Sequence, residues 1–173
     1  SNTFVVPRPG NVMIDLRYRL VHAGDFEPDE CSEALVAVDG VLVSPGPYEY
    51  LERYCGGGDG SGTQDSGWRI ARFSVPLETG VHIIEIGGFL NRKTFNNEVA
   101  EVFYDDVVIV QDNSGVFYVD DFQDGTSNGW VVFNDSGKTS DWQVSQGKYT
   151  QFAELVGDWD LSTHVGSFVF FND

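Results

Sequence analysis

Hydrophobic and polar residues alternate along several short stretches of the chain, as they do in strands with one buried face. The clearest stretch spans residues 12–20, where apolar side chains occupy one face and charged ones the other. The apolar face consists of Val12, Ile14, Leu16, Tyr18 and Leu20, and the charged face of Asp15, Arg17 and Arg19. Similar runs predict strands at 34–39, 41–44, 68–75, 81–89 and 101–110. These periodicities favour antiparallel strands and no long helix.

Turn residues separate these runs. Asp39-Gly40 is a strong hairpin signal between two apolar runs. Residues 44–67 lack any periodicity and are expected to form a loop outside the core, in which residues 50–54 could make one helical turn. Residues 116–173 again contain short strand-like runs between Gly, Asn, Asp and Ser, which is the pattern of sandwiches and jelly rolls.

Composition supports an all-β protein. The 173 residues include 20 Gly, 13 Phe and 7 Tyr but one Met, which suits aromatic strands joined by Gly-rich turns and excludes a helical bundle. The predicted fold is an antiparallel two-sheet β-sandwich of the jelly-roll, concanavalin-A-like class.

The chain is strongly acidic, with 10 basic and 27 acidic residues and a net charge of -17. Such a surface repels phosphate backbones, which argues against binding nucleic acid or anionic membranes. No apolar run approaches the roughly 18 residues of a membrane span, and the first residues do not resemble a signal peptide. We therefore expect a mature, excised segment with no membrane insertion.

Cys31 and Cys55 are the two cysteines of the chain, and they bracket an apolar hairpin and a polar loop. A disulfide between them would stabilise the fold by roughly 3 kcal/mol in the chain-entropy model. The alternative is a pair of buried thiols in a cytosolic protein. We favour the disulfide.

Several segments together resemble a known family. The segments Asp25–Glu30, 34–40, 56–62, 77–88, Asn91–Glu98 and Val102–Val107 are similar to the second half of extracellular concanavalin-A-like jelly rolls. Residues 120–130 and 140–149 resemble the first half of the same domains. Laminin-G-like and MAM-like modules and carbohydrate-binding modules of secreted bacterial proteins belong to this group. The resemblance implies a secreted or cell-surface module of a larger extracellular protein.

The order of the two halves is reversed relative to that family. One explanation is a single sandwich over residues 1–173, in which residues 11–110 supply the later strands and residues 116–173 the opening ones. The other is a second, truncated domain that starts at Ser114. We favour the single sandwich, because some 58 residues alone bury too little surface to be stable.

The resemblance also implies a structural Ca²⁺ that ties the opening strand to the closing one. Carried over to this chain, it points to Asp105 or Asp106 together with Asp121 or Asp124. One member of the Asp105-Asp106 pair must face inward in an alternating strand, and a buried carboxylate needs a partner. Ca²⁺ is the expected partner, and backbone amides or an arginine are the alternative.

A second acidic cluster matches two loops of the same relatives. It consists of Glu27, Asp29, Glu30 and Glu98. It could hold a further cation or form a polar ligand rim. The alternative is an ion pair of Glu30 or Glu98 with Arg92 or Lys93.

Aromatic residues outside the strand patterns are candidates for stacking on sugar rings. They are Trp130, Trp159, Tyr48, Tyr50 and Tyr54. Trp68 and Trp142 lie within strand patterns and are expected in the core. Trp159 could equally be exposed or buried.

The sequence contains no nucleophile-elbow, HEXXH, P-loop or Rossmann pattern. We therefore predict a non-catalytic module that binds carbohydrate or a cell-surface glycan, or mediates adhesion, with Ca²⁺ as a stabilising ion. The alternatives are a polysaccharide lyase or glycoside hydrolase on the same fold and a structural repeat of a surface protein.

Overall fold

The structure is a computed structural model that describes residues 1–57, 62–111, 115–126, 130–134, 140–145, 148–153 and 167–170. The described residues form an all-β fold. Its strands are β1 (Asn2–Val6), β2 (Gly10–Ala23), β3 (Cys31–Val38), β4 (Val41–Leu42), β5 (Glu52–Cys55), β6 (Gln64–Asp65), β7 (Arg69–Leu77), β8 (Gly80–Leu90), β9 (Val99–Gln111), β10 (Gly115–Asp120), β11 (Val131–Asn134), β12 (Ser140–Ser145), β13 (Lys148–Ala153) and β14 (Ser167–Phe170). Among the described residues, no helix is long and apolar enough to cross a membrane.

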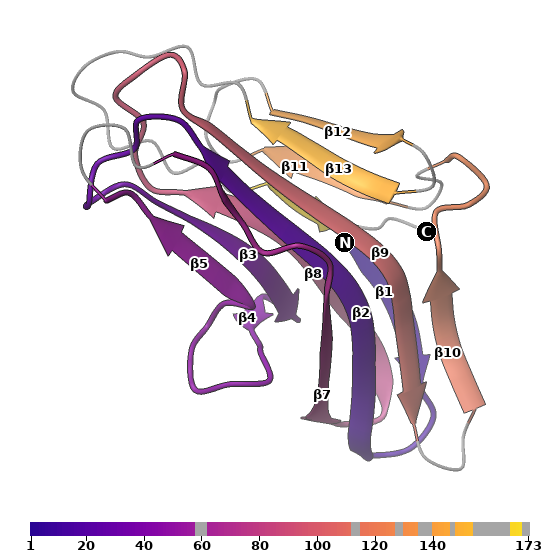
Figure 1. The fold of residues 1–173 in the computed structure, drawn as a ribbon. Coiled ribbons are helices and arrows are strands. Elements are labelled where there is room, and N and C mark those ends of the chain that lie inside the picture. The colour runs from indigo at the N-terminus through magenta and orange to yellow at the C-terminus, as the bar shows by residue number, and fades with distance from the viewer. Residues whose placement is uncertain are drawn as a thin grey trace.

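These strands form two antiparallel sheets that pack against each other (Figure 1), as the sequence predicts. The first sheet has the order β11-β14-β8-β3-β4, with β1 also paired to β8 and β5 to β3. The second has the order β12-β13-β9-β2-β6, with β10 also paired to β9 and β7 to β2. The fold is therefore a two-sheet β-sandwich.

Strand β2 shows how the sequence pattern specifies the sandwich. The five apolar side chains predicted to share a face, from Val12 to Leu20, are all buried, whereas the residues between them are partly exposed. The β3–β4 hairpin is also confirmed. Its turn residues Asp39 and Gly40 both have positive φ, 51° and 76°, and this is the conformation for which Asp-Gly is preferred in two-residue hairpins.

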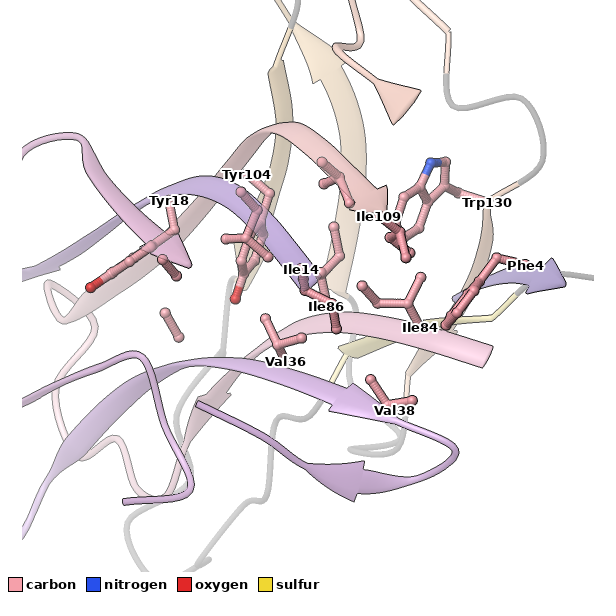
Figure 2. Packing of buried hydrophobic residues seen from close by; sticks show 14 of the residues in the cluster. Phe4, Ile14, Tyr18, Val36, Val38, Ile84, Ile86, Tyr104, Ile109 and Trp130 are labelled. Carbon is pink, nitrogen blue, oxygen red and sulfur yellow. The ribbon is translucent and has the colours of Figure 1, made fainter. Parts of the chain in front are cut away.

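The main core lies between the two sheets (Figure 2). Ile14, Tyr104 and Ile109 of one sheet face Val36 and Ile86 of the other in this view. A smaller apolar cluster of Phe26, Leu90 and Ala100 lies apart from this core, next to the β2–β3 and β8–β9 loops. The second cluster supports those two loops.

Tyr104 makes a polar connection between the sheets inside this core. The residue is fully buried, and its hydroxyl accepts a hydrogen bond from the Leu35 amide at 2.9 Å. The same oxygen lies 2.8 Å from the Leu35 carbonyl and 2.7 Å from the Gly87 carbonyl, to which it can donate. Leu35 and Gly87 are register partners in the first sheet. A side chain of β9 thus enters the hydrogen-bond ladder between β3 and β8.

A disulfide joins Cys31 to Cys55, as predicted, across the antiparallel pair β3–β5, where the two residues are direct partners. Gly56 follows at once and lies so close to the β2–β3 loop that an added Cβ would come within 2.0 Å of the Phe26 carbonyl oxygen. Disulfide and glycine together hold the segment after β5 against that loop.

Two local expectations were wrong. The described part of residues 44–67 is a loop except at β5 and β6, but it does not lie outside the core, because Leu51 and Tyr54 pack against the main cluster. Residues 52–55 form strand β5 instead of a helical turn, since their backbone pairs with β3. Strand β1, which no periodicity indicated, pairs with β8.

Strands from the C-terminal third pair with strands from the first two thirds. β10 pairs with the end of β9, from Val107 to Gln111, and β13 pairs with its beginning, from Ala100 to Tyr104. β14 pairs with β8 at Gly87 and Gly88. That residues 1–173 fold as one permuted domain stays a prediction.

Candidate functional site

The loop after β4 carries Tyr48, the most exposed aromatic residue among the described members of the predicted binding set. The Ser44 hydroxyl organises this loop by donating to the Gly46 carbonyl at 3.2 Å and to the Tyr48 carbonyl. At its far end, the Leu51 amide bonds to Ala34 of β3 at 2.8 Å. Just before the loop, the Val43 amide bonds to the Val36 carbonyl of β3 at 2.9 Å, so β3 anchors the loop at both ends.

Tyr48 and Tyr50 stack on each other within this loop. Their ring centroids are 5.2 Å apart and the rings are nearly parallel, at 5°. The Arg53 guanidinium of β5 lies over the Tyr50 ring, 5.8 Å from its centroid. Tyr48 remains 62% exposed, so that its ring is available to solvent. We name Tyr48, Tyr50 and Arg53 the tyrosine platform.

An open pocket of about 300 Å³ lies beside the platform, between the loop and strand β7. Its lining combines apolar and polar side chains. The residues that line it are Leu42, Val43, Ser44, Gly46, Pro47, Tyr48, Glu49, Phe73, Ser74, Val75 and Pro76. An apolar lining with a few polar groups is typical of small-ligand sites.

Charged side chains surround the platform. The Arg53 Nε lies 3.4 Å from Glu33 Oε1, and the two residues are direct partners across β3 and β5. The pKa of Glu33 is raised above its usual value, mainly by burial and to a lesser extent by the nearby Glu49. Arg53 opposes this shift. The site therefore presents carboxyl oxygens and guanidinium N–H groups beside an aromatic face. This arrangement can hold a ligand that has both hydroxyl groups and a flat apolar face.

No protein-family model, no curated protein and no solved structure matches the chain. The interpretation of the site therefore rests on its geometry and chemistry alone.

The other aromatic residues predicted to bind sugar do not belong to the platform. Trp130 is only 7% exposed and belongs to the main core, where its indole Nε1 donates to Asp120 Oδ2 at 2.7 Å. Its ring is thus used in packing instead of facing solvent. Tyr54 is partly buried against the same core. Trp159 lies outside the described residues.

Trp68, expected in the core, lies on the outer face of the second sheet. It is half-buried there, with the Arg17 guanidinium 5.3 Å from its ring centroid and the Phe103 ring at 6.4 Å. The expectation was wrong because Trp68 is in phase with the exposed Ile70 and Arg72 of β7, whereas Ala71, Phe73 and Val75 face the core. The side chain of Trp142 is outside the described part.

Asp105 and Asp106 occupy a β-bulge in β9. The pairing with β2 shifts between Asp15 and Arg17, and Asp106 adopts a φ of 51°. Asp105 is buried, as expected for one member of the pair, and its Oδ1 accepts the Asp106 amide at 2.9 Å. Asp106 pairs with Arg17 at 3.2 Å. These partners are the backbone amide and the arginine that the sequence left as the alternative to Ca²⁺.

The two acids expected to complete that ion site are turn residues. Asp121 Oδ1 accepts the Gln123 amide at 3.1 Å. Asp124 accepts both the amide and the hydroxyl of Thr126 at 2.8 Å, which lowers the pKa of its carboxyl. Local donors thus hold each of these carboxylates, and Ca²⁺ binding by the four acids stays a prediction. Across the described ranges, no group of three or more His, Cys, Asp or Glu side chains is placed to hold a metal.

The second acidic set divides into an outer and an inner pair. Asp29 is exposed and pairs with Arg92 at 2.5 Å, while Glu27 is partly exposed. Glu30 and Glu98 are completely buried, and Lys93, the other basic residue expected to pair with them, is 5% exposed in the same loop as Glu98. The two glutamate carboxyl groups are neighbours. Burial raises the pKa of Glu30, and the adjacent Glu98 carboxyl raises it further. The structure thus brings together two carboxyl groups that lie far apart in the sequence.

Sequence reasoning identified Tyr48 and Tyr50 but missed their surroundings. Arg53 was assigned to a loop, and nothing in the alternating pattern of β7 indicated that Phe73 and Val75 would line a pocket. The position of Arg53, opposite Glu33, follows only once β5 is known to pair with β3.

Proposed function

We propose that this chain is a secreted or cell-surface, non-catalytic β-sandwich module of the concanavalin-A-like jelly-roll type, which binds carbohydrate or mediates adhesion through glycans. The tyrosine platform beside the open pocket carries this proposal. Sugar rings offer an apolar C–H face and a rim of hydroxyl groups. The exposed ring of Tyr48 suits the face, and Ser44, Glu49, Glu33 and Arg53 suit the rim.

Two further observations support the proposal, one on the extracellular setting and one on the kind of partner. A disulfide persists in oxidising surroundings such as the exterior of the cell. The net charge of -17 disfavours nucleic acid and anionic membranes and leaves neutral glycans as suitable partners. Other domains of a larger extracellular protein are the expected covalent neighbours.

A glycan-array screen followed by calorimetry with the best ligand tests the proposal. We expect Tyr48→Ala to weaken binding about tenfold, because about 1.4 kcal/mol of ring contact is lost. Tyr48→Phe retains the ring and should bind within about twofold of the wild type.

The matched control is Ile70→Ala, which removes another exposed apolar side chain, on β7. It should leave both binding and melting temperature unchanged. Failure to bind any glycan, or equal binding by wild type and Tyr48→Ala, would refute the assignment of this surface.

A further inference from the structure

The β2–β3 loop and the β8–β9 loop lie against each other at one end of the sandwich. Asn97 Nδ2 of the second loop donates to Asp25 Oδ2 of the first at 2.6 Å. Asn91 of the second loop bonds twice to the first segment, accepting the Cys31 amide at 2.6 Å and donating to the Asp29 carbonyl at 2.8 Å. The two loops thus form one interlocked unit, which we name the loop junction, residues 24–31 and 91–98.

Glu30 and Glu98 place their carboxyl groups inside this junction. Both residues are 0% exposed. Each carboxylate has one oxygen held by backbone amides, since Glu30 Oε2 accepts the Glu27 amide at 2.6 Å and Glu98 Oε2 accepts those of Thr94 and Phe95 at 2.7 and 2.9 Å. These bonds fix the orientation of both groups before anything binds.

The other two oxygens are less well satisfied. Glu30 Oε1 is buried and has no hydrogen-bond partner. Glu98 Oε1 has a long contact of 3.5 Å with the Thr94 hydroxyl, which also bonds to Glu30. A buried carboxylate oxygen without a partner is unfavourable, and a neighbouring carboxylate makes it more so. A bound cation would relieve both effects.

We propose that Glu30 and Glu98, with the Thr94 hydroxyl, form a Ca²⁺ site that fastens the β2–β3 loop to the β8–β9 loop. The donors are all oxygens, which hard cations require. Two carboxylates supplemented by hydroxyl, carbonyl and water oxygens are a ligand set that Ca²⁺ accepts, whereas Zn²⁺ prefers nitrogen and sulfur. This inference does not depend on the tyrosine platform being a glycan site.

The principal alternative is a single proton shared by the two carboxyl groups. Burial and the nearby Glu98 raise the pKa of Glu30, so a proton would also relieve the repulsion. The two occupants differ in their response to calcium at constant pH, because only the ion site gains stability from added Ca²⁺.

The test compares thermal melting of the full chain at pH 7 in chelator and in CaCl₂, with stoichiometry from calorimetry. We expect one Ca²⁺ per chain and a rise in melting temperature of roughly 5–10 °C at 100 times the Kd. Glu30→Gln and Glu98→Gln should each abolish most of this rise. In chelator, both variants should melt no lower than the wild type, because the neutral amide removes the repulsion between two buried carboxylates.

Glu78→Gln is the matched control, since it removes one negative charge by the same change at an exposed position outside the junction. It should retain the full calcium response. Absence of calcium binding to the wild type would overturn the proposal and favour the shared proton. Undiminished binding by both glutamine variants would overturn it as well, because the ion would then be held elsewhere.

Discussion

Removing the Cys31–Cys55 disulfide should destabilise the protein by an amount that follows from the loop it closes. The two cysteines are 24 positions apart. In the chain-entropy model, a loop of this length corresponds to about 3.5 kcal/mol of unfolding free energy at 25 °C. For a chain of this size, the loss corresponds to a fall in melting temperature of roughly 7–14 °C.

The assay is urea denaturation of the double variant Cys31→Ala/Cys55→Ala against the oxidised wild type, followed by tryptophan fluorescence. Wild type reduced by a phosphine should unfold at nearly the midpoint of the double variant, since both lack the cross-link and retain the β3–β5 hydrogen bonds. Equal midpoints for oxidised wild type and double variant would refute the reasoning. So would a loss confined to the double variant, because it would then come from packing at Cys31, which is 4% exposed.

Three further substitutions can be tested by urea denaturation, and the first is at His22, which is fully buried. Burial lowers the pKa of His22 from 6.5 to about 4. Below pH 6.5 the unfolded chain therefore binds a proton at this residue that the folded chain does not bind, and the folded state loses stability. Between pH 7 and pH 4 the wild type should therefore lose about 3 kcal/mol more than His22→Gln, and equal losses would contradict this. Gly56→Ala should cost about 1–3 kcal/mol because its Cβ meets the Phe26 carbonyl, whereas Gly46→Ala, which meets nothing within 4 Å, should cost almost nothing. Tyr104→Phe should cost about 1–3 kcal/mol by leaving buried backbone groups unpartnered, and a change below about 0.5 kcal/mol would show that those groups find other partners.

The sequence alone was sufficient where a local rule decides the structure. The period of two along β2 identified its buried face, because one face of the strand meets the core along its whole length. The Asp39-Gly40 hairpin was predictable because few other residue pairs adopt two successive positive φ angles. Strands β1 and β5 were missed, because they are short and their pairing partners lie elsewhere in the chain.

The candidate sites were predictable only in part, for the same reason. Tyr48 and Tyr50 could be singled out as aromatic residues in a Pro- and Gly-rich segment, but their stacking depends on how the loop folds. Glu30 and Glu98 were both named as acids of matching loops. Their complete burial, and the choice of this pair over Glu27 and Asp29, depend on how two distant loops meet.

The position of Tyr104 in the ladder between β3 and β8 also selects among possible alignments of the two sheets. A slip of β9 by two residues would bring Val102, an aliphatic side chain on the same buried face, to the place of the phenol. The Leu35 amide and the Leu35 and Gly87 carbonyls would then face a group that can neither donate nor accept. The phenol therefore adds a cost of a few kcal/mol to such a slip, beyond the loss of the bulge at Asp105 and Asp106. A single hydroxyl thus makes one alignment of the sandwich distinguishable from its neighbours while the chain folds.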